Sequence, residues 1–275
     1  MKRFWIATLL ASVTATPALA VHNDVLIGAV GGKLTGGSAD LGDDGEPGGV
    51  GADADNYALG ALVFEGELND TGVGVWEGDE PGVNAISQAN HNLFATGGSA
   101  LPASADLNFT LKAFDIGGDT RNLWYWDGSG PVAFGAPPTG AEMTVFDVFP
   151  FATVDGSATD VSAIAPWATT AADGSLHQHR LFQLIDVGNP GVLPAAGVYV
   201  IGVEFGMTGL TSSDILMLVL NAGLDEEDHE AAVEFIENLN TNPGGPGDPT
   251  VPEPASALAM VMGLAAIGAR RQRRE

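Results

Sequence analysis

The stretch 106-DLNFTLKAFDI-116 shows the pattern that decides the fold class of this chain. Apolar and polar side chains alternate along it, with Leu107, Phe109, Leu111 and Ala113 on one side and Asn108, Thr110 and Lys112 on the other. A period of two residues predicts an antiparallel β-strand that has one buried face and one solvated face.

Six further stretches have the length of a strand and lie between turn signals rich in Gly, Pro, Asp and Asn. They are DVLIGAVGGKL (24–34), YALGALVFEGEL (57–68), MTVFDVF (143–149), LHQHRLFQLIDV (176–187), VYVIGVEFGM (198–207) and DILMLVLNAGL (214–224). Many short strands joined by glycine-rich turns predict an all-β fold. We expect an antiparallel β-sandwich over residues 21–239, for which the jelly roll is one arrangement.

One segment, LDEEDHEAAVEFIENLN (224–240), has helical rather than strand spacing. Its apolar side chains that share a helix face are Ala232, Phe235, Ile236 and Leu239. Asp225 is the expected N-cap, and the acids that follow it are expected to form a solvated face near the positive end of the helix dipole. The next stretch, NTNPGGPGDPTV (240–251), has no apolar periodicity and is predicted to be a flexible linker.

The N-terminal stretch MKRFWIATLLASVTATPALA has two basic residues, an apolar run, and small residues at Ala18 and Ala20. This order predicts a secretory signal peptide over residues 1–20, which signal peptidase removes after Ala20. The folded protein is then expected to begin at Val21, outside the cytoplasm.

Residues 21–250 contain 4 basic and 33 acidic residues, a net charge of −29. A surface with this net negative charge repels phosphate backbones and anionic lipid headgroups. We therefore expect the protein to bind neither nucleic acid nor the membrane surface. The chain has no cysteine, which excludes disulfides, thiolate metal sites and a cysteine nucleophile.

The C-terminal stretch VPEPASALAMVMGLAAIGARRQRRE differs from the acidic body that precedes it. Its uncharged run at 255–269 predicts a transmembrane helix, but fifteen residues cover only about 22 Å of a hydrocarbon core of about 30 Å. Four arginines follow and are expected to stay in the cytoplasm, which places the β domain outside. The helix is therefore expected to hold the chain in the inner membrane only transiently.

Pro252-Glu253-Pro254, an apolar helix and a terminal arginine cluster, in that order, resemble the PEP-CTERM sorting signal of Gram-negative bacteria. The resemblance covers residues 252–275. It implies recognition by an exosortase, cleavage near the Pro-Glu-Pro motif, and delivery to the cell surface or the exopolysaccharide matrix. The body more loosely resembles uncharacterised all-β proteins that carry this tail, and that likeness implies no activity.

His177 and His179 are the candidate metal ligands, because in a strand they project from one face about 7 Å apart and can share a divalent metal ion. The His-x-His pair is similar to that of cupins, but the nearby following Glu of that family is missing, and the next His along the chain is His229. His22 and His91 would complete a site only through tertiary proximity. The alternative is two partly exposed histidines bonded to acidic neighbours.

Trp124 and Trp126 share a strand face and are a candidate sugar-stacking platform, with core packing as the alternative. The acidic loop at 40–56 fails the EF-hand spacing and is expected to be solvated. Motifs of serine hydrolases, phosphate-binding loops and HExxH metalloproteases do not occur in the sequence. We therefore expect a surface protein with a structural or matrix-binding role rather than an enzyme. The alternative is a metal-dependent or carbohydrate-active protein centred on His177 and His179.

Overall fold

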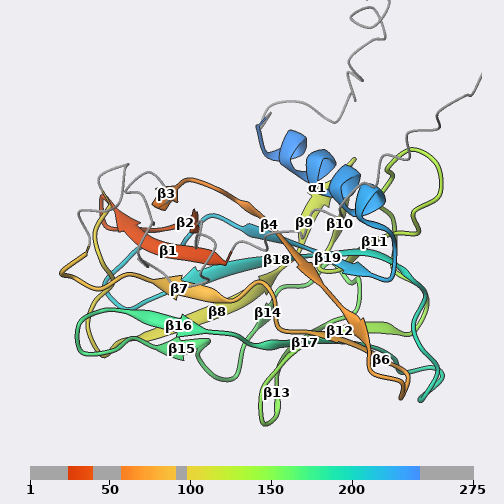
Figure 1. Cartoon of the computed structure of the whole chain (residues 1–275), viewed down its shortest axis with the longest axis horizontal. Coiled ribbons are helices and arrows are strands. Elements are labelled where there is room, and N and C mark those ends of the chain that lie inside the picture. Colours follow the sequence, from red (N-terminus) through yellow and green to blue (C-terminus); the bar gives the residue numbers. More distant parts are fainter. Residues whose placement is uncertain (1–23, 40–56, 91–97, 242–275) are drawn as a thin grey trace, which may run out of the picture.

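The computed structural model describes residues 24–39, 57–90 and 98–241 (Figure 1). These residues form nineteen strands and one helix, so the all-β prediction is confirmed. The predicted signal peptide, the acidic loop at 40–56 and the tail from residue 242 onward lie outside the described residues.

The described strands are β1 (Val25–Val30), β2 (Lys33–Ala39), β3 (Tyr57–Leu59), β4 (Val63–Glu67), β5 (Asn69–Asp70), β6 (Val75–Gly78), β7 (Val83–Ala85), β8 (Asp106–Lys112), β9 (Phe114–Ile116), β10 (Asp119–Arg121), β11 (Trp124–Trp126), β12 (Ala141–Phe146), β13 (Pro150–Val154), β14 (Val161–Ser162), β15 (Ala168–Thr169), β16 (Leu176–Gln178), β17 (Leu181–Asp186), β18 (Gly197–Gly206) and β19 (Leu216–Ala222). The helix α1 spans Glu226–Thr241.

The largest sheet has the order β14-β8-β18-β19-β4, with β11 paired to β18 and β15 paired to β8. Two five-stranded sheets, β16-β7-β1-β2-β3 and β13-β12-β17-β6-β5, and the pair β10-β9 complete the fold. The predicted antiparallel pairing is wrong at two places, because β1 pairs parallel with β7 and β4 pairs parallel with β19. Both pairs join strands that are far apart in sequence, where no hairpin forces an antiparallel arrangement.

The strand predicted from the opening stretch is shorter than its alternation suggests. Leu107, Phe109 and Leu111 are buried in β8, as expected. At Ala113 the chain leaves the strand, and the backbone N–H of Ala113 donates to Asp160 Oδ1 at 2.9 Å. This break shifts the alternation by one residue, so Phe114 and Ile116 are buried in a different apolar cluster from the one that contains β8.

The central sheet has an apolar cluster on each face. The larger one includes Trp167, whose ring centroid lies 5.2 Å from that of Phe109, 6.1 Å from Phe182 and 5.6 Å from Phe205. The smaller cluster joins β11, β18 and β19 to α1. Because both of its faces are covered, β18 is apolar almost without interruption rather than alternating.

Trp124 and Trp126 belong to the smaller cluster and are only 1% and 4% exposed. Neither indole offers a face to a sugar ring, so the predicted stacking platform at these two positions is wrong. Their strand, β11, pairs with the central strand β18 instead of lying at a surface.

Helix α1 begins as predicted, since the backbone N–H of Asp228 donates to Asp225 Oδ1 at 3.1 Å. Ala232 and Ile236 are buried against the sheet. The helix ends at Thr241, two residues into the predicted linker. Within the described ranges, no helix is long and apolar enough to cross a membrane; the predicted transmembrane segment at 255–269 lies outside them.

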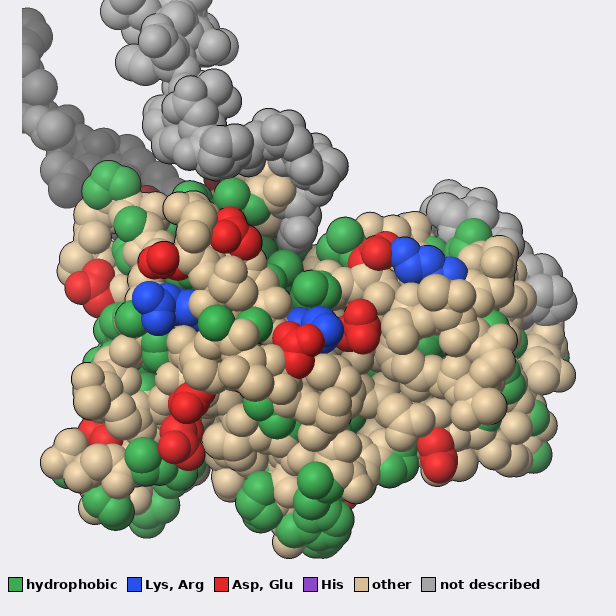
Figure 2. Space-filling model, turned by 180° about the vertical axis from the view of Figure 1, so that it is seen from behind, with side chains coloured by type: hydrophobic (Ala, Val, Ile, Leu, Met, Phe, Trp, Pro, Cys, Tyr) green, Lys and Arg blue, Asp and Glu red, His purple; other side chains and the backbone are tan. Residues whose placement is uncertain are grey.

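The four basic side chains of the described residues all pair with aspartates: Lys33 with Asp214, Lys112 with Asp160, Arg121 with Asp119, and Arg180 with Asp147. Figure 2 shows this on one face of the molecule, where each basic group has an acidic neighbour. Most acids therefore lack a basic partner, and the field of the protein attracts cations.

Candidate metal centre

Strand β7 brings together side chains that are more than 150 residues apart in the sequence. Strand β16 pairs with one edge of β7, with His177 opposite Asn84, and β1 pairs with the other edge, with Val25 opposite Val83. Asp24 immediately precedes β1 and so lies close to His177. The predicted single strand at 176–187 is two strands, and His179 lies in the break between β16 and β17.

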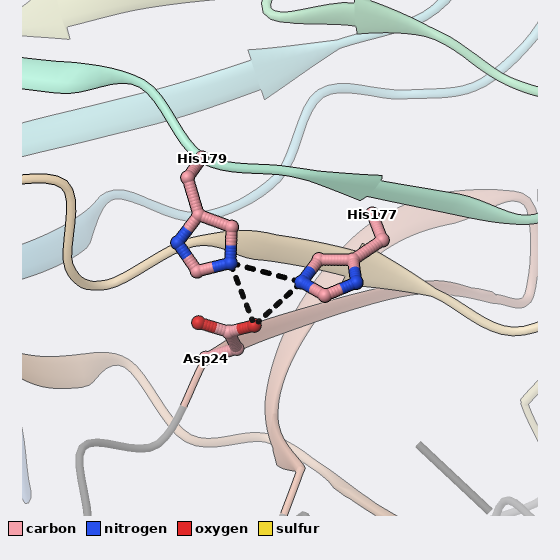
Figure 3. Close-up of side chains that lie close together, drawn as sticks. All are labelled: Asp24, His177 and His179. Carbon is pink, nitrogen blue, oxygen red and sulfur yellow. Dashed lines mark hydrogen bonds and ion pairs between the residues drawn. The ribbon is translucent and has the colours of Figure 1, made fainter. Parts of the chain in front are cut away.

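His177 and His179 both point at Asp24 (Figure 3). Their Nε2 atoms are 2.9 Å apart. Asp24 Oδ2 lies 3.6 Å from His177 Nε2 and 3.8 Å from His179 Nε2. A point equidistant from three atoms with these separations lies about 2.0 Å from each, which is the bond length of Zn²⁺ to imidazole nitrogen and carboxylate oxygen.

Neighbouring groups hold these ligands in place. Asp24 Oδ1 accepts a hydrogen bond of 2.8 Å from the backbone N–H of Gly82, and the Asn84 side-chain amide donates to Oδ2. His179 Nδ1–H donates to the Asp79 carbonyl oxygen at 3.0 Å. In a neutral imidazole that bond leaves the lone pair on Nε2, the atom that faces the other two ligands.

Gly82 makes room for the His179 ring. A Cβ atom at position 82 would lie 2.6 Å from His179 Cε1, closer than carbon atoms approach without displacement. The absence of a side chain at this position therefore lets the imidazole lie against the backbone of Gly82.

Glu80 adds a second carboxylate next to the triad of Asp24, His177 and His179. Its Oε1 lies 3.6 Å from His179 Nδ1. Burial, and then the negative charge of Asp24, raise the pKa of Glu80 to about 7. Glu80 therefore gains or loses its proton near neutral pH, and this changes the net charge beside the triad by one unit.

The triad is open on one side. The His177 and His179 side chains are 49% and 31% exposed, whereas Asp24 is 3% exposed. A metal ion with three protein ligands would keep one position open to solvent, which is the pattern of reactive rather than closed structural sites. His22 and His91, the other sequence candidates, lie outside the described residues.

A second group of ligand atoms, which the sequence reading missed, joins Glu67 of β4 to Glu226 and His229 of α1. The imidazole of His229 is fully buried, and its Nε2 lies 3.1 Å from the Val219 carbonyl oxygen. Nδ1 lies 3.1 Å from Glu67 Oε1, within ion-pair distance, but the two atoms are not aligned for a regular hydrogen bond. Burial opposes the charged imidazole, but Glu67 and the Val219 carbonyl raise the pKa of His229 above its usual 6.5.

Comparison with known families gives one match: residues 250–274 fit the description "PEP-CTERM protein-sorting motif". The tail of this chain therefore carries a PEP-CTERM sorting motif. The motif contains the predicted Pro252-Glu253-Pro254 and the arginine cluster. No curated protein and no solved structure matches the chain.

The PEP-CTERM motif implies processing by an exosortase, and hence export to the cell surface or the extracellular space. The match covers the tail and not the β body.

Proposed function

We propose that this PEP-CTERM protein binds a divalent transition metal ion at the cell surface through Asp24, His177 and His179. The observation that supports the proposal is the spacing of the three ligand atoms, which leaves a position about 2.0 Å from each. The uncompensated acids of the body raise the local concentration of cations around it.

The ligand set favours a particular class of ion. Two imidazole nitrogens and one carboxylate oxygen suit Zn²⁺ and Fe²⁺, whereas Ca²⁺ and Mg²⁺ prefer oxygen ligands alone. The bond from His179 Nδ1 to the Asp79 carbonyl is the outer-shell contact that metal-bound histidines commonly make.

Elemental analysis and Zn²⁺ titration of the purified protein test the proposal. We expect one Zn²⁺ equivalent that is lost in the double variant His177→Ala/His179→Ala. Asp79→Asn is the matched control, because it removes an exposed charge beside the site while leaving the backbone carbonyl in place. Identical Zn²⁺ binding by the wild type and the double variant would overturn the proposal.

A second proposed function is a structural or matrix-binding role, with exopolysaccharide as the partner. It is favoured by the sorting motif, which directs the chain to the surface. Co-sedimentation of the mature protein with exopolysaccharide from the native host tests it. Recovery of the protein only in the supernatant would contradict a matrix-binding role.

For export, we propose that signal peptidase removes residues 1–20. The helix at 255–269 then anchors the chain transiently in the inner membrane. The β-sandwich at 21–239 and the linker at 240–251 then remain outside. The apolar cluster shared by residues of the central and five-stranded sheets supports the sandwich arrangement. Intact-mass analysis of host protein is expected to find a chain that begins at Val21 and lacks the segment from about Ala255. Mature protein that retains Arg270 would show a permanent anchor instead.

A further inference from the structure

The buried imidazole of His229 faces an electron-rich neighbour on each side. Nε2–H donates to the Val219 carbonyl oxygen at 3.1 Å. A neutral imidazole has one N–H, so its Nδ1 carries a lone pair. That lone pair lies 3.1 Å from Glu67 Oε1, and two lone pairs in contact repel each other. A cation between them would relieve the repulsion.

No basic side chain of the described residues supplies that cation. The four of them are engaged with aspartates elsewhere. A third ligand is in place, however, because a carboxylate oxygen of Glu226 lies within 4.8 Å of both other ligand atoms. The Asn221 amide donates to Glu67 Oε1 at 3.2 Å and orients it.

We propose that Glu67, Glu226 and His229 bind a second divalent metal ion, of the Zn²⁺ or Mn²⁺ class, which fastens α1 to β4. His229 Nδ1 is buried, has no aligned hydrogen bond and lies within 4.8 Å of a carboxylate oxygen of each glutamate. A backbone carbonyl bonded to the other ring nitrogen is a usual feature of metal-bound histidine. Glu226 is exposed and Glu67 is 31% exposed, so an ion can enter from solvent.

The competing occupant is a proton on Nδ1. The groups that favour it are Glu67 and Glu65 of β4, with Glu226 of α1 nearby, while β19 presents only the Val219 carbonyl and the neutral Asn221. A proton and a metal ion respond in opposite directions to alkaline pH, because a metal ligand must first lose its proton.

The experiment uses the full chain with His177→Ala/His179→Ala, so that the surface triad contributes nothing. Thermal unfolding is followed at pH 8 with added Zn²⁺ or Mn²⁺, and Mg²⁺ serves as the ion control. We expect the midpoint to rise by about 5–10 °C at a metal concentration of about 100 times Kd. Adding Glu226→Gln is expected to remove most of this rise, and the exposed Glu230→Gln to leave it intact.

A midpoint that does not respond to Zn²⁺ or Mn²⁺ and instead rises only when the pH is lowered would overturn the proposal and assign the cluster a proton. Failure at this site is distinguishable from failure of the surface triad, because Glu226→Gln alone retains Asp24, His177 and His179. Zn²⁺ binding by that variant reports on the triad by itself.

Discussion

The two histidine–carboxylate clusters differ in which partner is buried. In the triad at β7 the carboxylate of Asp24 is buried and the imidazoles reach solvent, whereas at α1 the imidazole of His229 is buried and the carboxylates reach solvent. Asp24 has two N–H donors of its own, from Gly82 and Asn84, but His229 Nδ1 has none. The buried carboxylate of the triad therefore has hydrogen-bond partners without a metal ion, whereas His229 Nδ1 in the second cluster needs a cation as its partner.

The largest expected effect comes from His229→Ala. The substitution empties a buried site and leaves the Val219 carbonyl without its donor, so we expect the free energy of unfolding to fall by about 2–4 kcal/mol. His177→Ala, at an exposed position, is expected to cost less than about 1 kcal/mol. Urea unfolding of both variants measures the difference, and equal losses would mean that the two clusters do not differ as described.

Asp24→Asn breaks the triad at its buried member. The variant retains an oxygen for the Gly82 N–H but loses the negative charge and turns an N–H₂ group toward the Asn84 amide, so we expect Zn²⁺ to bind about 30–100 times more weakly and the free energy of unfolding to fall by about 1–2 kcal/mol. Isothermal titration on a Glu226→Gln background isolates the triad from the second cluster. Unchanged affinity would remove Asp24 from the ligand set.

Gly82→Ala tests the placement of one ring. The new Cβ would displace the His179 imidazole, so we expect Zn²⁺ affinity at the triad to fall about tenfold. Gly135→Ala is the matched control, because a Cβ there has no neighbour within 4 Å. Equal titration curves for the two variants would show that the position of His179 is not critical.

The smallest expected effect is that of pH on protein freed of metal by a chelator. The pKa of His229 is raised in the folded state, so the stability it contributes is present below 6.5 and is lost as the pH rises through the raised pKa. The raised pKa of Glu80 has an effect of the same sign, because the ionised form of Glu80 is disfavoured in the fold. The stability that Glu80 contributes is therefore lost as the pH rises from 4.5 to about 7. Urea midpoints from pH 6 to 9 on a Glu80→Gln background separate the two, and a curve that stays flat would contradict a raised pKa for His229.

The sequence predicted those features that depend on neighbours along the chain. Alternation located β8, helical spacing and Asp225 located α1, and the His-x-His pair located half of the triad. Asp24 could not be predicted as the third ligand, since only the pairing of β1 and β16 with β7 brings it close. The acids next to His229 in the sequence are equally well explained by the start of a helix. No neighbouring residue in the sequence indicates that Glu67 of β4 lies beside His229 in the fold.

The chain leaves the described fold through the last residue of α1, and this determines how the body responds to a pull on its C-terminal tail. A helix loaded at its end unravels turn by turn, whereas β19, bonded on both sides by β18 and β4, would have to shear along its whole length. Extending the 16 residues of α1 adds roughly 30 Å of length before the sheet bears load. Glu226 and His229 lie in the first turns of α1, far from the tail, so their cluster would be the last contact to yield. Helix α1 is thus an extensible segment between the C-terminal tail and the β body.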